Sequence, residues 1–149
     1  MYYIGVKRIE AEPMALGMYN DHKGWTIPED EDPAKEGYLV TYSDTYSSWS
    51  PKEVFDDAYL AIGGDGTKIT QDTVNEFMGI LVASQIDDKT TLVTAETITG
   101  FRQHEASSCV DPKNYDAEIG KNICKKRIED TLRKCLGFVL QWANYGLKK

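Results

Sequence analysis

The last third of the chain carries one long apolar stripe, and this stripe constrains the fold more than any other feature. From Asn114 to Tyr145 apolar residues recur at i, i+3 and i+4, as on the buried face of an amphipathic helix. The stripe consists of Ile119, Ile123, Ile128, Leu132, Cys135, Leu136, Val139, Leu140 and Ala143. A helix of roughly 32 residues would be about 48 Å long, whereas a globule of this chain length is only about 38 Å across. We therefore expect either a break near Gly120 or Gly137, or packing of the overhanging part against another subunit. We favour the second, because Gly137 would allow another backbone to approach closely.

Three segments before this helix have the character of β-strands. Residues 80–86, 90–98 and 101–110 are separated by turn residues at 87–89 and 99–100. The simplest arrangement is a three-stranded antiparallel meander. The third strand has no clean apolar face, so we expect it to border solvent or to line a polar site. A brief helix over residues 70–78 precedes the meander.

The first part of the chain predicts a smaller mixed structure. Residues 2–11 and 38–42 have strand character, a short helical turn is expected over 15–21, and the acidic stretch 29–33 is expected to be a solvated loop. A further helix begins at Ser50-Pro51-Lys52-Glu53, where Ser50 would cap the free amides, Pro51 would occupy the first helical position and Glu53 would complete a capping box.

Charge divides the chain near its most glycine-rich stretch. Residues 1–66 contain 5 Lys/Arg against 13 Asp/Glu, a net charge of −8, whereas residues 67–149 contain 12 against 11, a net charge of +1. We predict an acidic α/β module over residues 1–62, a Gly-rich linker over 63–69 and a meander-plus-helix module over 70–149. The fold class is α+β: an antiparallel β-meander with a long C-terminal α-helix, preceded by a small α/β module.

Composition excludes several classes of protein. The net charge of −7 argues against a basic clamp for double-stranded DNA. No apolar run is long enough to cross a membrane, and the N-terminus has no signal-peptide pattern. The three cysteines lie at irregular spacing without a CxxC pair, which is typical of thiols in a reducing compartment and gives no metal site. We expect a cytosolic protein without a metal ion.

The residues indicate binding rather than catalysis. The chain has no GxSxG, HExxH, Walker A or dinucleotide-binding motif, so we expect neither an enzyme nor a cofactor. The long helix carries a surplus of cations, and the chain contains three Trp and nine Tyr. Cations for phosphates and aromatic rings for bases are the requirements of a small-nucleotide pocket. A basic helix face that is simply solvated, or that balances the acidic module, remains the alternative.

Two sets of segments carry a distinctive pattern of residues. In the second module they are Gly100-Phe101, Ser107 to Asp116, Glu118-Ile119-Gly120 and Leu136 to Gln141. In the first module they are Glu12-Pro13-Met14, Gly24-Trp25, Gly37 to Val40 and Trp49-Ser50-Pro51. This pattern resembles that of a family of small bacteriophage proteins designated by phage gene numbers. Within this broad family the chain resembles the first type of Thoeris anti-defence proteins, phage sponges that sequester the cyclic ADP-ribose-type signal of an infected bacterium.

The resemblance implies a function and a set of partners. It implies non-destructive binding of a cyclic ADP-ribose isomer, or of a cyclic dinucleotide or trinucleotide, in the host bacterial cytoplasm. It also implies homo-oligomers built from dimers, a hexamer being one such assembly, with pockets at subunit interfaces. We expect Arg102 to contact a phosphate, Ser107 and Ser108 to contact phosphate or ribose hydroxyls, and Tyr19 and Trp25 to stack on a base.

Two other functions compete with the sponge. The acidic first module, with Glu29-Asp30-Glu31-Asp32 in one loop, suits an inhibitor that docks on a basic host or defence protein. A phage accessory protein without a small ligand is the third possibility. Salt would discriminate the first two, because a complex held by charge weakens sharply as ionic strength rises.

Overall fold

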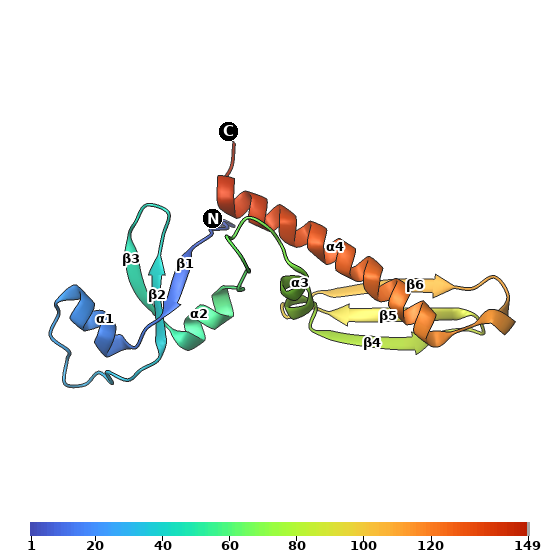
Figure 1. Ribbon diagram of the computed structural model, residues 1–149, viewed down its shortest axis with the longest axis horizontal. Helices are drawn as coiled ribbons and strands as arrows, with labels where there is room; N and C mark the ends of the chain where they lie inside the picture. Colours follow the sequence, from blue (N-terminus) through green and yellow to red (C-terminus); the bar gives the residue numbers. More distant parts are fainter. Residues whose placement is uncertain (149) are drawn as a thin grey trace. The chain divides into compact units, whose positions relative to one another are not determined.

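The computed structural model describes residues 1–148, which form two antiparallel three-stranded sheets and four α-helices (Figure 1). The predicted α+β class is confirmed, including the β-meander and the long C-terminal helix. The chain divides into two compact units. Unit 1 comprises Met1–Leu60 and the residues from Trp142 onward, and unit 2 comprises Ala61–Gln141. No helix within residues 1–148 combines the length and the apolar content that a membrane span requires.

Unit 1 is a small sheet with two short helices. Its elements are β1 (Glu10–Pro13), α1 (Leu16–Lys23), β2 (Gly37–Thr41), β3 (Ser47–Pro51) and α2 (Lys52–Ala58). The strand order is β1-β2-β3, so β2 is central and pairs antiparallel with both neighbours. Val40 of this central strand is 1% exposed and forms the core of the unit together with Tyr19 of α1.

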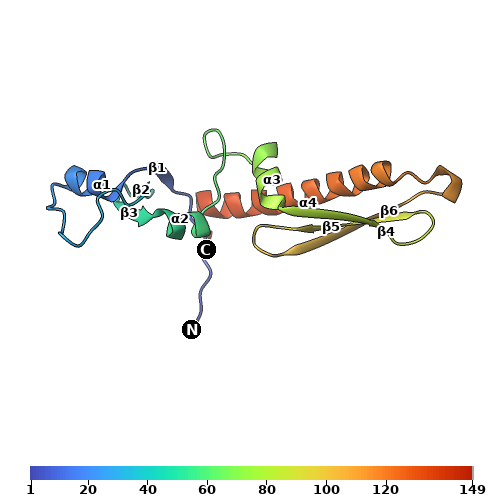
Figure 2. The same ribbon diagram turned by 90° about the horizontal axis from the view of Figure 1, so that it is seen from below.

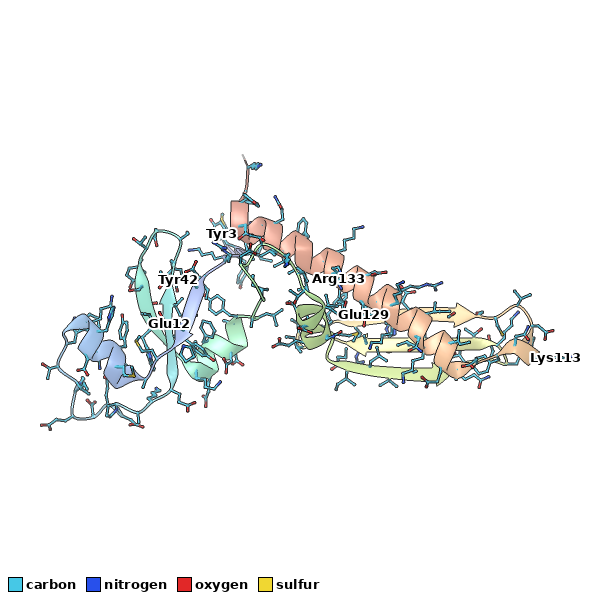
Figure 3. All side chains as sticks on the ribbon, viewed as in Figure 1. Tyr3, Glu12, Tyr42, Lys113, Glu129 and Arg133 are labelled. Carbon is cyan, nitrogen blue, oxygen red and sulfur yellow. The ribbon has the colours of Figure 1, made fainter. Side chains whose placement is uncertain are left out.

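The strand predicted from residue 2 is wrong for residues 2–9. Only Glu10–Pro13 pairs with β2, and β2 ends at Thr41, directly opposite Glu10. The residues before Glu10 therefore have no neighbouring strand within residues 1–148, whatever their intrinsic preference. Tyr3, labelled in Figure 3, is 88% exposed.

The predicted cap of α2 is also wrong, although the helix exists. Ser50 pairs with Tyr38 in β3, a strand that the sequence analysis did not predict, and Pro51 is the residue that precedes the first turn. No side chain caps this helix, and the Ser50 hydroxyl donates to the Pro51 carbonyl at 3.4 Å. Because Ser50 is held in the register of the sheet, its side chain cannot serve the helix.

Unit 2 is the predicted meander with helices attached. Its elements are α3 (Gln71–Met78), β4 (Ile80–Gln85), β5 (Thr90–Glu96), β6 (Arg102–Ser108), a 3-10 turn (Pro112–Asn114) and the part of α4 (Ala117–Tyr145) that ends at Gln141. The strand order is β4-β5-β6 with antiparallel pairing throughout. Figure 2 shows α4 running along one face of this sheet.

Helix α4 buries a narrower stripe than the sequence predicts. The buried residues are Gly120, Cys124, Ile128, Leu132, Leu136 and Leu140. Ile119 is 60% exposed and Ile123 is 39% exposed. The residues that follow them, Gly120 and Cys124, are smaller and face the sheet. The small residues let the helix approach β5, whose Val93 and Ala95 are fully buried.

The helix is continuous, so the alternative of a break at a glycine is excluded, while packing of its overhanging part against another subunit stays a prediction. Gly120 serves close packing, because a Cβ placed there would lie 2.5 Å from Thr91 Oγ1. At Gly137, where we expected a close approach, a Cβ would meet no atom of the described residues within 4 Å.

Replacing Thr70 by Ala should lower the free energy of unfolding by about 1 kcal/mol, a typical value for loss of an N-cap. The Thr70 hydroxyl accepts a hydrogen bond from the Thr73 amide at 3.2 Å and so caps α3. Ser50→Ala is the matched control, because Ser50 precedes a helix without capping it. Chemical denaturation of both variants measures the difference, and equal losses would contradict the assignment of these caps.

Candidate functional site

The candidate site is a pocket of about 520 Å³ in unit 1. This volume lies within the range of pockets that hold small molecules. The pocket lies between α1, the segment that follows α1, and β3. Its lining residues are Leu16, Tyr19, Asn20, Trp25, Thr26, Pro28, Glu31, Ser48 and Trp49.

A tight turn after α1 brings two aromatic rings together. Gly24 adopts a left-handed conformation with φ of 70°, which glycine accepts without steric cost. The Trp25 amide then donates back to the Asn20 carbonyl at 2.9 Å. As a result Trp25 meets Tyr19 edge-to-face, with the ring centroids 5.9 Å apart and an interplanar angle of 87°. Trp25 remains 58% exposed and offers a free ring surface.

The opposite side of the pocket is fixed by β3. Trp49 is half-buried, and its indole N–H donates to the Met14 carbonyl at 2.8 Å. Since that donor is used within the chain, Trp49 contributes to the pocket through its ring rather than through its N–H group.

The acidic loop is attached to the start of α1. The Gly17 amide donates to the Pro33 carbonyl at 2.9 Å, and the Leu16 amide donates to the Lys35 carbonyl at 3.0 Å. The side chains of residues 29–33 are exposed, as the sequence predicts. The backbone bonds nevertheless place Glu31 at the pocket.

The polar wall of the pocket consists of Asn20 and Glu31. Asn20 is only 5% exposed, and its Nδ2 donates to Glu31 Oε2 at 3.2 Å. The lining residues include no Lys or Arg. Lys23 lies nearby, but its ammonium group donates to Ser47 Oγ at 3.1 Å and lies 5.5 Å from the Tyr19 ring centroid. The pocket therefore combines aromatic surfaces with hydrogen-bond acceptors, which suits a planar group that carries N–H donors.

A second aromatic cluster in unit 1 packs α2 on β2. Tyr38 stacks on Phe55 at 4.1 Å between centroids, and Phe55 stacks on Tyr59 at 4.8 Å. Burial raises the pKa of Tyr59. A hydrogen bond from Lys52 lowers the pKa of Asp56, its neighbour one turn along the exposed side of α2. We assign this cluster to packing.

The residues predicted for phosphate and ribose lie in unit 2 and do not form one cluster there. Arg102 begins β6 and donates to Glu96 Oε2 of β5 at 2.6 Å. Ser108 ends the same strand, about 20 Å away at the usual rise of a strand, and its hydroxyl is hydrogen-bonded to Thr90 at 2.8 Å. Ser107 points to the opposite face of the sheet. Their contact with a ligand stays a prediction, as does base stacking by Tyr19 and Trp25.

Several cations of α4 are engaged within unit 2. Arg127 donates to the Ala106 carbonyl at 3.1 Å. Arg133, labelled in Figure 3, donates to the Ile69 carbonyl at 3.2 Å and also pairs with Gln71. Lys121 and Lys125 form ion pairs along the helix. These contacts favour a structural role for the basic surface of the helix.

Comparison with known proteins identifies a phage family. The model of a phage protein family described as N4 Gp49/phage Sf6 gene 66 matches residues 53–143, more than half of the chain. No curated protein and no solved structure matches. The matched span covers the sheet of unit 2 and most of α4, while the pocket lies before it. Residues 1–148 contain no group of three or more His, Cys, Asp or Glu that could hold a metal ion.

Proposed function

Since the chain belongs to the N4 Gp49/phage Sf6 gene 66 family of phage proteins, we propose that it is a phage anti-defence protein that binds and sequesters a signalling nucleotide. The ligand class is a cyclic ADP-ribose isomer or a cyclic oligonucleotide. The protein holds this ligand without degrading it, in the cytoplasm of the infected bacterium.

The observation that carries the proposal is the pocket of unit 1. Tyr19 and Trp25, which the sequence predicts to stack on a base, both line this pocket between α1 and β3, as does Trp49. Stacking of a base on an aromatic ring contributes about 1–3 kcal/mol. Its volume of about 520 Å³ lies within the range of pockets that hold small molecules, and its open mouth would leave part of a nucleotide in solvent.

The proposed active form is a homo-oligomer built from dimers. Supporting this, unit 2 leaves large apolar side chains uncovered on the face of its sheet away from α4, among them Ile80 at 68% and Val82 at 58% exposure. Apolar patches of this kind are typical of protein–protein interfaces.

Thermal unfolding with a panel of cyclic ADP-ribose isomers, cyclic dinucleotides and cyclic trinucleotides tests the function. A ligand present at 100 times its Kd, bound only to the folded state, adds roughly 2.7 kcal/mol of stability. We expect a clear rise in Tm with one class and recovery of intact ligand after heating. No shift across the panel would contradict the proposal.

Replacing Trp25 by Ala should weaken binding of the ligand found in that panel by about 10-fold, because the exposed stacking surface is lost. Trp25→Phe is the control, since it keeps an aromatic ring at the same position. Titration calorimetry measures both affinities, and an unchanged affinity of Trp25→Ala would remove this pocket from the proposal.

The acidic inhibitor remains the second candidate, supported by the exposed side chains of residues 29–32. In that case the protein would capture a basic protein from bacterial lysate, and capture would fall steeply between low and physiological salt. Binding by stacking and burial should depend much less on salt.

A further inference from the structure

The polar wall of the pocket in unit 1 presents acceptors to a ligand. Asn20 is only 5% exposed, and its Nδ2 donates a hydrogen bond to Glu31 Oε2. The Glu31 carboxylate has no other hydrogen-bond or ion-pair partner within residues 1–148. A carboxylate offers about four lone-pair sites on two oxygens, so most of its accepting capacity remains available.

The other polar groups of the pocket agree with this assignment. The Trp49 N–H, which could have donated to a base, is used by the Met14 carbonyl. Thr26 and Ser48 line the pocket with hydroxyl groups, which can donate or accept. The negative charge of Glu31 disfavours a phosphate at this wall, so a nucleotide would place its base here and direct its phosphates away.

Guanine and adenine differ in the arrangement of hydrogen-bond donors and acceptors that they would present to the Glu31 carboxylate. Guanine presents N1–H and N2–H₂ side by side, two adjacent donors that match the oxygens of one carboxylate. Adenine presents one donor group, N6–H₂, beside the lone pair of N1, which a carboxylate repels. A matched pair of hydrogen bonds to a base edge discriminates between bases by about 10-fold or more in affinity.

We propose that this pocket selects guanine over adenine, with Glu31 as the specificity-determining residue and Asn20 as the residue that positions its carboxylate. The inference rests on the proposed function, in which this pocket holds the base of a nucleotide. Among the ligands considered there, it favours a cyclic oligonucleotide that contains guanine over a cyclic ADP-ribose isomer, whose base is adenine.

Titration calorimetry of the full chain with the 5′-monophosphates of guanosine, inosine and adenosine tests the selection. We expect guanosine monophosphate to bind about 10-fold more tightly than adenosine monophosphate. Inosine monophosphate keeps N1–H but lacks the N2 amino group, so its affinity should lie between the two.

Two variants locate the selection at Glu31. Glu31→Gln replaces one of the two acceptor oxygens by an NH2 donor, and it should bring the affinities for guanosine and adenosine monophosphate to within about 3-fold of each other. Glu29→Gln is the matched control, because Glu29 lies in the same acidic loop but does not line the pocket. It removes the same charge and should leave the ratio unchanged. Unchanged Tm and far-ultraviolet circular dichroism verify that both variants fold.

The outcomes separate this inference from the proposed function. Equal binding of the guanosine and adenosine nucleotides, weakened by Trp25→Ala, would overturn guanine selection and leave nucleotide binding in place. A guanine preference that survives Glu31→Gln would overturn the assignment to Glu31. Failure of the three monophosphates and of the cyclic panel to bind would overturn both proposals.

Discussion

Replacing Ile128 by Ala should lower the free energy of unfolding by about 4 kcal/mol, a large fraction of the stability of a small domain. Ile128 is 1% exposed and lies on the stripe of α4 that also carries Gly120 and Cys124. Both of those residues lie against Thr91 of β5. Removing the side chain therefore leaves a cavity between the helix and the sheet. Chemical denaturation followed by circular dichroism measures the loss.

Ile119→Ala is the matched control in the same helix. The substitution removes the same atoms, but Ile119 is 60% exposed, so the loss should stay below about 0.5 kcal/mol. Similar losses for the two variants would show that Ile119 is covered in solution. Repeating the measurement at lower protein concentration would then identify a second copy as the cover.

Replacing Gly120 by Val should destabilise the protein by about 3 kcal/mol, the upper end of the usual cost of overpacking a core. A Cβ at this position would lie 2.5 Å from Thr91 Oγ1 and 2.8 Å from Thr91 Cβ, so the helix would have to move away from β5. We expect a lower Tm for the protein, because the contact between α4 and the sheet of unit 2 is lost. Thr91→Ala in the same chain should restore part of the loss, because it removes Oγ1, the atom that lies nearest to the new side chain.

Gly137→Ala provides the opposite test in the same helix. A Cβ there would meet no atom of the part of the chain that the structure describes within 4 Å, so the substitution should add about 1 kcal/mol through helix propensity alone. Thermal unfolding should show a Tm raised by about 2–4 °C. A lower Tm would mean that another backbone lies against Gly137.

The sheet of unit 2 could be predicted because its signals are local. Each strand ends at a turn with its own chemistry, and Asp87 accepts from the Lys89 amide at 2.9 Å as an Asx turn requires. Thr70 likewise caps the helix that begins beside it. Such features depend on a few neighbouring residues, which the sequence displays directly.

The wrong predictions, the strand over residues 2–9 and the cap at Ser50, concern residues whose structure depends on a segment distant in the sequence. Residues 2–9 have strand propensity, but β2 is too short to pair with them. Ser50 has the chemistry of a cap, but its pairing with Tyr38 holds it in a strand.

Most of the candidate pocket was missed for the same reason, since only two of its nine lining residues, Tyr19 and Trp25, were predicted. Tyr19 and Trp25 lie six residues apart, and Gly24 between them signals the turn that joins them. Asn20 and Glu31 meet only because backbone amides of α1 bind the carbonyls of Pro33 and Lys35. Hydrogen bonds between backbone groups do not depend on which side chains the residues carry, so the sequence could not distinguish Glu31 from the other acidic residues of the loop.

The order of the elements in unit 2 has a consequence for synthesis on the ribosome. All three strands precede α4, so the sheet leaves the ribosome before the helix that covers it. At about 5–20 residues per second, the 29 residues of α4 take on the order of seconds to be made. During that interval Val93 and Ala95, fully buried in the finished protein, lack their cover. A newly made chain is thus most open to chaperones and to aggregation at this step, and a nonsense mutation early in α4 would make that exposure permanent.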